Sequence, residues 1–133
     1  MNAVFVDTSA IFALLVADDR RHAQAVRAWD ASIAESGCRI VTSNYVVAES
    51  YDLTRRRLGI DALRVADTFV RTYLEIVFVG RQQHERARTL LISRATRDLS
   101  LVDCASFVIA REEKVDAVFA YDRHFEDERF TLL

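Results

Sequence analysis

The sequence predicts an α/β protein with a mainly parallel sheet that is covered by helices on both faces. Short, continuously apolar segments alternate along the chain with longer segments whose apolar residues recur at helical spacing. This alternation is typical of buried parallel strands that are joined by crossover helices. Three glycines and no proline also favour helices with short connections, because these residues are the usual residues of turns.

Length and charge limit the class of protein. The 133 residues predict one domain, spanning residues 1–133, which can bury enough apolar surface to fold unaided. The composition, 51% hydrophobic and 29% charged, is that of an ordinary globular protein. A net charge of −2 excludes the strongly basic surface of a typical nucleic-acid binder, so any such binding must be local.

Several features predict a cytoplasmic protein with no membrane segment. Cys38 and Cys104 are too few and too far apart in the sequence for a disulfide framework or a zinc site, so we expect reduced thiols. The chain start is uncharged and an aspartate interrupts its apolar stretch, which does not fit a secretory signal. The longest apolar run, 10–17, is shorter than the roughly 20 residues that a membrane helix needs.

The first strand and the first helix are separated by a polar triplet. Residues 3–6 are all apolar and predict a buried strand. Residues 9–16 have the length and apolar character of a buried helix, which Asp7 or Thr8 can cap. Apolar residues at helical spacing then predict a second helix at 21–36.

The middle of the chain continues the alternation. Trp29 lies on the apolar face of the second helix, where we expect it to anchor the core. Residues 39–42 predict the second strand, and Ser43 or Asn44 can cap the helix that follows at 46–58 and stops at Gly59. Asp61 is expected to cap the next helix. The remaining elements are expected to be a helix at 61–73, a strand at 76–79, an arginine-rich helix at 82–95, a helix at 101–114, a strand at 117–120 and an edge strand at 130–132.

This order of strands and helices predicts that four acidic residues are neighbours at one edge of the sheet. Asp7 directly follows the first strand, and Asp122 closely follows the fourth. Glu49 lies one to two turns into the helix after the second strand, and Asp103 lies in the first turn of the helix that leads into the fourth. Because all these helices begin at the carboxyl ends of the strands, the four carboxylates can converge there.

Three of these acids also have a structural explanation. Asp7 and Asp122 can each cap a helix, and Ser100 with Asp103 has the spacing of a capping box. Glu49 lies too far into its helix to be a cap, and a lone carboxylate among residues that look buried is costly. Glu49 therefore favours a functional cluster over a set of caps.

Carboxylates packed together either raise their pKa values or recruit a cation. A cluster of hard oxygen ligands suits Mg²⁺ or Mn²⁺. The hydroxyls of Thr8 and Ser9 could orient a carboxylate or a water molecule at such a site. The sequence thus predicts a metal site at the carboxyl ends of the strands.

Four segments, in order, resemble the motifs of the PIN-domain nucleases, and among them the VapC-type toxins of bacterial toxin–antitoxin pairs. The segments are FVDTSAIFALL with Asp7 and its hydroxyl neighbours, NYVVAESY with Glu49, SLVDCASFVIA with Asp103, and VFAYDRHF with Asp122. The resemblance covers nearly the whole chain. One departure is Ala120, where many relatives carry a threonine or serine.

The resemblance implies a three-layer α/β/α sandwich of four to five strands in the order 3-2-1-4-5. It implies metal-dependent hydrolysis of RNA that leaves a 5′-phosphate and a 3′-hydroxyl. Asp7 and Asp103 would be the primary ligands of Mg²⁺ or Mn²⁺, and Glu49 and Asp122 would complete the site. The implied partners are an antitoxin protein, which would block the acidic site, and a second copy of the chain in a homodimer.

Basic and apolar residues on the helix after the second strand have two explanations each. Arg55, Arg56 and Arg57 form the densest basic run, which can contact RNA or antitoxin or can complement the helix dipole. The apolar residues Tyr51, Leu53 and Leu58 can belong to an interface or to the core. The three histidines share no metal-ligand spacing, so we expect His22, His84 and His124 on the surface.

Three other functions remain as alternatives. A phosphatase of the haloacid-dehalogenase type would need a second aspartate at position 9, which is serine. A signalling receiver domain would need its aspartate after the third strand, where Gly80 and Arg81 stand. A non-catalytic RNA-binding or interaction module would differ from a nuclease in its failure to bind Mn²⁺.

Overall fold

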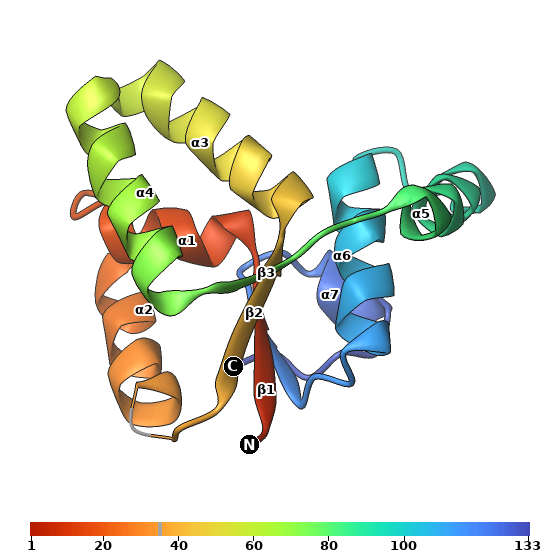
Figure 1. Cartoon of the computed structure of the whole chain (residues 1–133), viewed down its shortest axis with the longest axis horizontal. Helices are drawn as coiled ribbons and strands as arrows, with labels where there is room; N and C mark the ends of the chain where they lie inside the picture. The colour runs from red at the N-terminus through yellow and green to blue at the C-terminus, as the bar shows by residue number, and fades with distance from the viewer. Residues whose placement is uncertain (35) are drawn as a thin grey trace.

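The computed structural model describes residues 1–34 and 36–133, and it has the predicted three-layer arrangement. Four parallel strands form one sheet in the order β3-β2-β1-β4, which confirms the predicted fold class. In Figure 1 the sheet lies in the middle, with α1 to α4 on one side and α5 to α7 on the other. The strands are β1 (Ala3–Val6), β2 (Arg39–Ser43), β3 (Glu75–Val77) and β4 (Ala117–Phe119). The helices are α1 (Thr8–Leu15), α2 (His22–Ala28), the π-helix η1 (Trp29–Ile33), α3 (Asn44–Leu58), α4 (Ile60–Tyr73), α5 (Arg81–Ser93), α6 (Leu101–Glu112) and α7 (His124–Asp127).

The central strand β1 is buried along its whole length between β2 and β4. The hydroxyl of Thr42 on β2 donates to the carbonyl oxygen of Val6 at 2.8 Å, and the N–H of Asp7 donates to Phe119 of β4 at 3.0 Å. The predicted fifth strand is reduced to a parallel bridge between Val118 and Leu132 at the edge beside β4. The strand order 3-2-1-4-5 is thus confirmed, and the fifth strand consists of one bridge.

The second helix differs from the prediction because its hydrogen bonding changes at Trp29. Helix α2 ends at Ala28 and continues as the π-helical segment η1. Trp29 is only partly buried and packs beside the core, with its ring 5.3 Å from that of Phe69 and 5.6 Å from that of Tyr73. It therefore attaches this helical segment to α4 instead of anchoring the centre of the core.

The predicted cap of the fourth helix was wrong. Helix α4 begins at Ile60 with Gly59 as the residue before it, and the carboxylate of Asp61 instead accepts a hydrogen bond from Arg64. Gly59 has a φ of +93°, a conformation that side chains disfavour, and this lets one residue turn the chain from α3 into α4. The third strand is also shorter than predicted, because Phe78 is 70% exposed and lies outside the sheet.

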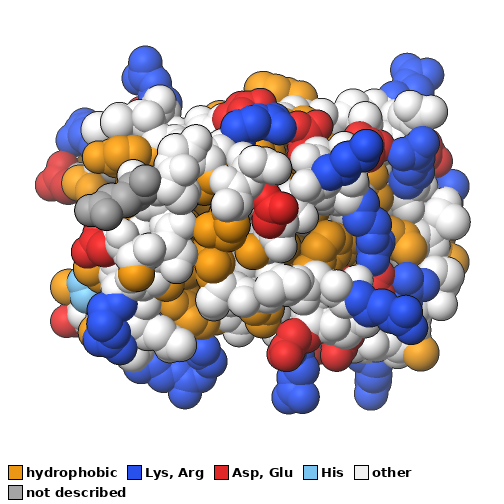
Figure 2. Space-filling model, turned by 90° about the horizontal axis from the view of Figure 1, so that it is seen from below, with side chains coloured by type: hydrophobic (Ala, Val, Ile, Leu, Met, Phe, Trp, Pro, Cys, Tyr) orange, Lys and Arg blue, Asp and Glu red, His pale blue; other side chains and the backbone are white. Residues whose placement is uncertain are grey.

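The surface carries both charges in mixture. Figure 2 shows the molecule from below the view of Figure 1, which is the side where the N-terminus lies. Basic and acidic side chains surround an apolar area in the middle of this face. Basic and acidic side chains are interspersed on this face, in agreement with the small net charge. Within the part of the chain that the structure describes, no helix has the length and apolarity to cross a membrane.

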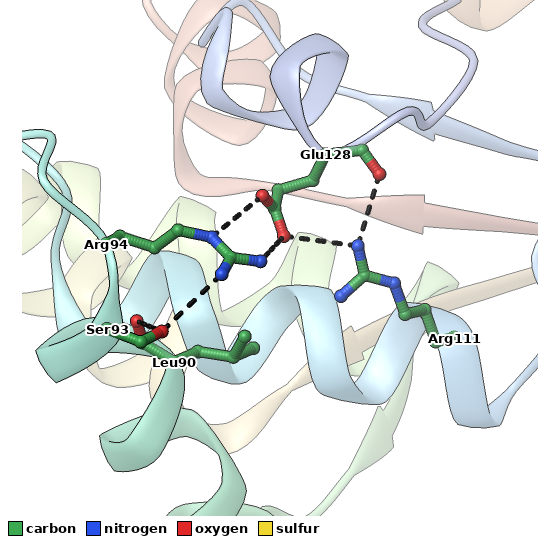
Figure 3. Close-up of polar contacts among 5 residues, drawn as sticks. All are labelled: Leu90, Ser93, Arg94, Arg111 and Glu128. Carbon is green, nitrogen blue, oxygen red and sulfur yellow. Dashed lines mark hydrogen bonds and ion pairs between the residues drawn. The ribbon is translucent and has the colours of Figure 1, made fainter.

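A nearly buried glutamate joins the helices on one side of the sheet. The carboxylate of Glu128, after α7, accepts hydrogen bonds from Arg94 at 3.2 and 3.0 Å and from Arg111 of α6 at 3.2 Å (Figure 3). Arg111 also donates to the carbonyl oxygen of Glu128 at 3.1 Å. The Glu128 side chain is 14% exposed, and its hydrogen bond with Arg94 lowers its pKa. This cluster therefore fixes the end of α5 against α6 and α7.

Replacement of this glutamate should destabilise the fold. We expect Glu128→Gln to lower the free energy of unfolding at neutral pH by about 1–3 kcal/mol, since hydrogen bonds to a charged group are lost. Because the folded-state pKa is lowered, this contribution is present above the ordinary pKa of 4.5 and is lost as the pH falls through the folded-state value. Thermal melts of both proteins from neutral to acidic pH measure the difference.

The matched control is Glu85→Gln, which breaks an exposed pair with Arg88 on α5. This change should alter the free energy of unfolding by less than about 0.5 kcal/mol. Equal effects of the two substitutions would show that the Glu128 cluster contributes no more than a surface ion pair.

Candidate active site

Four carboxylates from four different elements meet at the carboxyl ends of the strands. Asp7 follows β1 and is 4% exposed, and Asp122 follows β4. Glu49 belongs to α3 and Asp103 to the first turn of α6, and both are partly buried. The charges of Asp103 and Glu49 both act on Asp7, and that of Asp122 acts on Asp103, so the four carboxylates lie near one another, while their role as metal ligands stays a prediction.

Asp7 is held in place by the helix that it caps. Its Oδ2 accepts hydrogen bonds from the Ser9 N–H at 3.3 Å and from the Ser9 hydroxyl at 2.7 Å. The Ser9 hydroxyl oxygen in turn accepts the N–H of Tyr121 at 2.9 Å, which links the end of β1 to the residue before Asp122. Thr8 is buried, and its hydroxyl accepts a hydrogen bond from Ser50, the neighbour of Glu49, at 3.2 Å. Both hydroxyls therefore connect the elements that carry the acids.

The capping explanations hold alongside the cluster. Asp103 and Ser100 form the predicted capping box, with each side chain accepting the other's N–H at 3.0 Å. Asp122 accepts the N–H of His124 at 2.9 Å and so shapes the turn before α7. Capping fixes the direction of these side chains and leaves oxygen lone pairs available for another ligand.

The electrostatics of the site oppose ionisation. The pKa of Asp7 is raised from 3.8 to about 7, first by burial and then by the charges of Asp103 and Glu49, against the hydrogen bonds from Ser9. The pKa of Asp103 is also raised, chiefly by burial and further by Asp122. In the described part of the chain no lysine or arginine is among the main causes of either shift. The main opposing charge is that of His124, which lowers the pKa of Asp103, and no comparable cation of the described residues is among the main causes of the shift at Asp7.

A metal ion fits this set of donors. One carboxylate oxygen each from Asp103 and Asp122 and a ring nitrogen of His124 lie within 4.8 Å of one another. Carboxylate oxygens suit Mg²⁺ and Mn²⁺, and an added imidazole favours the softer Mn²⁺ of the two. Asp7 and Glu49 supply further carboxylates beside this group.

His124 was missed by the sequence analysis, which expected it on the surface. Its exposure is only 8%, and its Nε2 lies 3.5 Å from Asp98 and 3.8 Å from Asp122. The available signal was its position two residues after a predicted site acid. The other two histidines are also partly buried, where a ring nitrogen of His22 bonds the carbonyl oxygen of Ala13 at 2.9 Å and one of His84 bonds the Tyr45 hydroxyl.

The basic run lies at the C-terminal end of α3. Arg55, Arg56 and Arg57 are exposed in the last turn, a position that complements the helix dipole, and the guanidinium of Arg57 lies 5.9 Å from the ring centroid of Phe12. Tyr51 donates its hydroxyl to Asp67 on α4 at 2.6 Å, so it joins two helices of this chain. Leu58 is 48% exposed and stays available to a partner.

A cavity also lies away from the acids. It has a volume of about 880 Å³ and lies between α5 and the last turns of α6, with Val108 and Leu90 in its lining. Its arginines include Arg86 and Arg111, which already form ion pairs with Glu112 and Glu128. The chemistry of the carboxylate cluster, and not cavity size, identifies the site.

The raised pKa of Asp7 predicts how the stability of the metal-free protein depends on pH. Because the folded state holds the Asp7 proton more tightly than the unfolded state does, stability should fall as the pH rises from about 4 to about 7. We expect Asp7→Asn to be more stable than the wild type above that range, by up to about 4 kcal/mol, and equally stable at pH 4 and below. Thermal melts in EDTA across this pH range measure it.

Asp61→Asn, which removes a carboxylate whose side chain is 95% exposed, should give a difference that does not change with pH. A pH-independent difference for Asp7→Asn as well would contradict the burial of an ionisable, unbalanced carboxylate.

Comparisons with known proteins agree with the motifs. A family model described as the PIN domain matches residues 4–130. The chain is 35% identical over 124 residues to the 23S rRNA-specific endonuclease VapC20 of Mycobacterium tuberculosis, covering 92% of this chain and 91% of that protein. It is 30% identical to the ribonuclease VapC26 of the same species, covering 92% and 89% of the two chains.

Solved structures show the same fold. The crystal structure of VapC20, described as a toxin that cleaves the sarcin–ricin loop, has a TM-score of 0.88 at 30% identity and covers 98% of both chains. The VapBC2 complex of Rickettsia felis, bound to a DNA fragment from its promoter, has a TM-score of 0.71 at 15% identity and covers 98% of this chain and 96% of that chain, which supports the fold alone. With its family model matched over nearly the whole chain, this protein belongs to the PIN-domain family.

Proposed function

We propose that this chain is a metal-dependent endoribonuclease and the toxin of a VapC-type toxin–antitoxin pair. The observation that carries the proposal is the burial of Asp7 among other carboxylates, with no arginine or lysine of the described residues among the main causes of its pKa shift. The relatives named as a 23S rRNA endonuclease and a ribonuclease support RNA as the substrate class. A carboxylate cluster of this kind favours the binding of an external cation.

In the proposed site, Asp7 and Asp103 hold Mg²⁺ or Mn²⁺, with Glu49 and Asp122 completing the ligand set. When bound, the ion would supply Lewis-acid chemistry, lowering the pKa of a water nucleophile and neutralising charge on the phosphodiester. His124 adds a nitrogen donor beside Asp122. The resemblance to PIN nucleases implies products with a 5′-phosphate and a 3′-hydroxyl.

The neighbouring hydroxyls act as positioning groups. Ser9 donates to Asp7 and accepts from Tyr121, so it fixes the carboxylate that follows β1 relative to the loop that carries Asp122. Thr8 accepts from Ser50 and fixes α1 against the turn of α3 that carries Glu49. Ligands held in this way need little rearrangement when a cation binds, which favours tight and specific coordination.

The partners stay predictions. An acidic site repels RNA, so exposed arginines must contact its phosphates, and Arg55, Arg56 and Arg57 are available at the end of α3. An antitoxin that covers the acidic site and a homodimer are implied by the resemblance to VapC-type toxins. Cleavage of cellular RNA implies a cytoplasmic location, and the free thiols of Cys38 and Cys104 agree with it.

Cleavage of total RNA by the purified, antitoxin-free protein tests the proposed activity. We expect cutting with Mg²⁺ or Mn²⁺ and none with EDTA. Asp103→Asn, which keeps an acceptor for the Ser100 N–H and removes the charge, should lower the rate at least about 100-fold.

The matched control is Asp61→Asn, whose exposed carboxylate pairs only with Arg64 in the described structure and which should cut as the wild type does. Failure of the wild type to cut RNA with either ion, together with failure to bind Mn²⁺ in calorimetry, would contradict the nuclease and favour a binding module. Cutting that persists in EDTA would contradict the metal-dependent mechanism.

A further inference from the structure

A second, smaller cavity adjoins the carboxylate cluster. It has a volume of about 310 Å³, at the small end of the range for ligand sites, and is lined by α1, the loop before α2, α3 and the second residue after β4. The lining residues that matter here are Ser9, Phe12, Arg20, Arg21, Leu53 and Tyr121.

The cavity shares a wall with the site of the acids. Ser9, which lines the cavity, donates its hydroxyl to Asp7 at 2.7 Å and accepts the N–H of Tyr121 at 2.9 Å. Tyr121 also precedes Asp122 in the chain. A group bound in the cavity would therefore lie directly beside the phosphate that the carboxylates and their cation act on.

One wall of the cavity is a stacked pair of planar groups. The guanidinium of Arg21 lies over the ring of Tyr121, 4.9 Å from its centroid, and Tyr121 packs edge-on against the buried ring of Phe119 at 6.0 Å. The backbone of Arg21 is fixed as well, because its N–H donates to the Asp19 carboxylate at 2.8 Å. These contacts hold the planar surface in a defined place.

The cavity combines apolar surface with charged side chains, in which Arg20 and Arg21 outnumber the acidic Asp19. Phe12 and Leu53 supply apolar surface, and the guanidinium of Arg57 lies over the ring of Phe12. Arg20 is exposed at the rim and can reach a phosphate. Unpaired nucleobases bind to surfaces of this kind, stacking on aromatic rings or guanidinium planes while nearby cations contact the backbone.

We propose that this cavity binds one unpaired base of the RNA substrate, next to the phosphate that is cleaved. Tyr121 and Arg21 stack against the base, and Arg20 contacts the adjoining phosphate. The inference rests on the proposed ribonuclease function and adds that the substrate must present an unstacked base, as a loop or single strand does and a regular duplex does not. Stacking uses the face of the base, so this subsite tolerates different bases.

The test uses a single-stranded oligoribonucleotide that contains a site which the wild type cuts in total RNA. Copies of this RNA each carry one abasic ribose in place of a nucleotide. We expect one abasic position beside the cut to raise KM about 5- to 100-fold in the wild type, the range that loss of one stacked base produces. In Tyr121→Ala, KM for the intact RNA should rise by a similar factor, and the abasic copy should bind no worse than the intact one.

Three further measurements separate this role from a structural one. Tyr121→Phe should recover most of the KM that Tyr121→Ala loses, because a ring is restored, and Tyr73→Ala on the distant helix α4 should match the wild type. Mn²⁺ binding by Tyr121→Ala should be unchanged, because the N–H that bonds Ser9 belongs to the backbone. Should Tyr121→Ala fail to fold, Arg21→Ala replaces it, with the same expected rise in KM.

Two results would overturn the base subsite and leave the ribonuclease intact. The wild type could cut RNA and show no abasic position that raises KM, or the Tyr121 and Arg21 variants could have the KM of the wild type. A fall in kcat with unchanged KM would also overturn it. Wild-type protein that cuts no RNA would overturn the ribonuclease and the subsite together.

Discussion

The burial of the Asp7 carboxylate is the constraint on which the candidate site depends. Asp7 follows the central strand β1 and is only 4% exposed, and its own N–H donates to Phe119 of β4. Hydrogen bonds from Ser9 stabilise the ionised form, yet burial and the charges of Asp103 and Glu49 outweigh them and raise the pKa to about 7. A carboxylate in this position is costly to the fold, and a bound divalent cation would remove much of that cost. The free energy that the fold loses at Asp7 is thus linked to the affinity of the site for its ion.

The same hydrogen bonds organise the surroundings of the acids. Ser9 connects Asp7 to Tyr121, and Tyr121 forms the wall of the adjoining cavity with Arg21. A substrate would meet carboxylates on one side of Ser9 and a planar, cationic surface on the other. This division reconciles a net charge of −2 with binding of a polyanion, since positive charge is needed only at the rim of the cavity.

The sequence predicted the sheet and the acids because both follow from local patterns. Apolar runs mark buried parallel strands, and the positions of Asp7, Glu49, Asp103 and Asp122 just after strand ends or near helix starts bring them to one edge. The remaining features depend on contacts between distant parts of the chain. The burial of His124 requires α7 to pack beside α6, the cluster of Glu128 requires the end of α5 to meet α6, and Trp29 in the π-helical turn contacts Phe69 of α4. Asp61 failed as a cap because Gly59 makes the turn.

The link between Asp7 and the metal is tested most directly by counting the protons released when Mn²⁺ binds. Calorimetric titrations in buffers with different ionisation enthalpies give this number at each pH. With the pKa of Asp7 near 7, release of about one proton per chain is expected at about pH 6, falling toward zero above about pH 8. Binding of Mn²⁺ with no proton release at any pH in this range would show that the buried carboxylate does not take part in holding the ion.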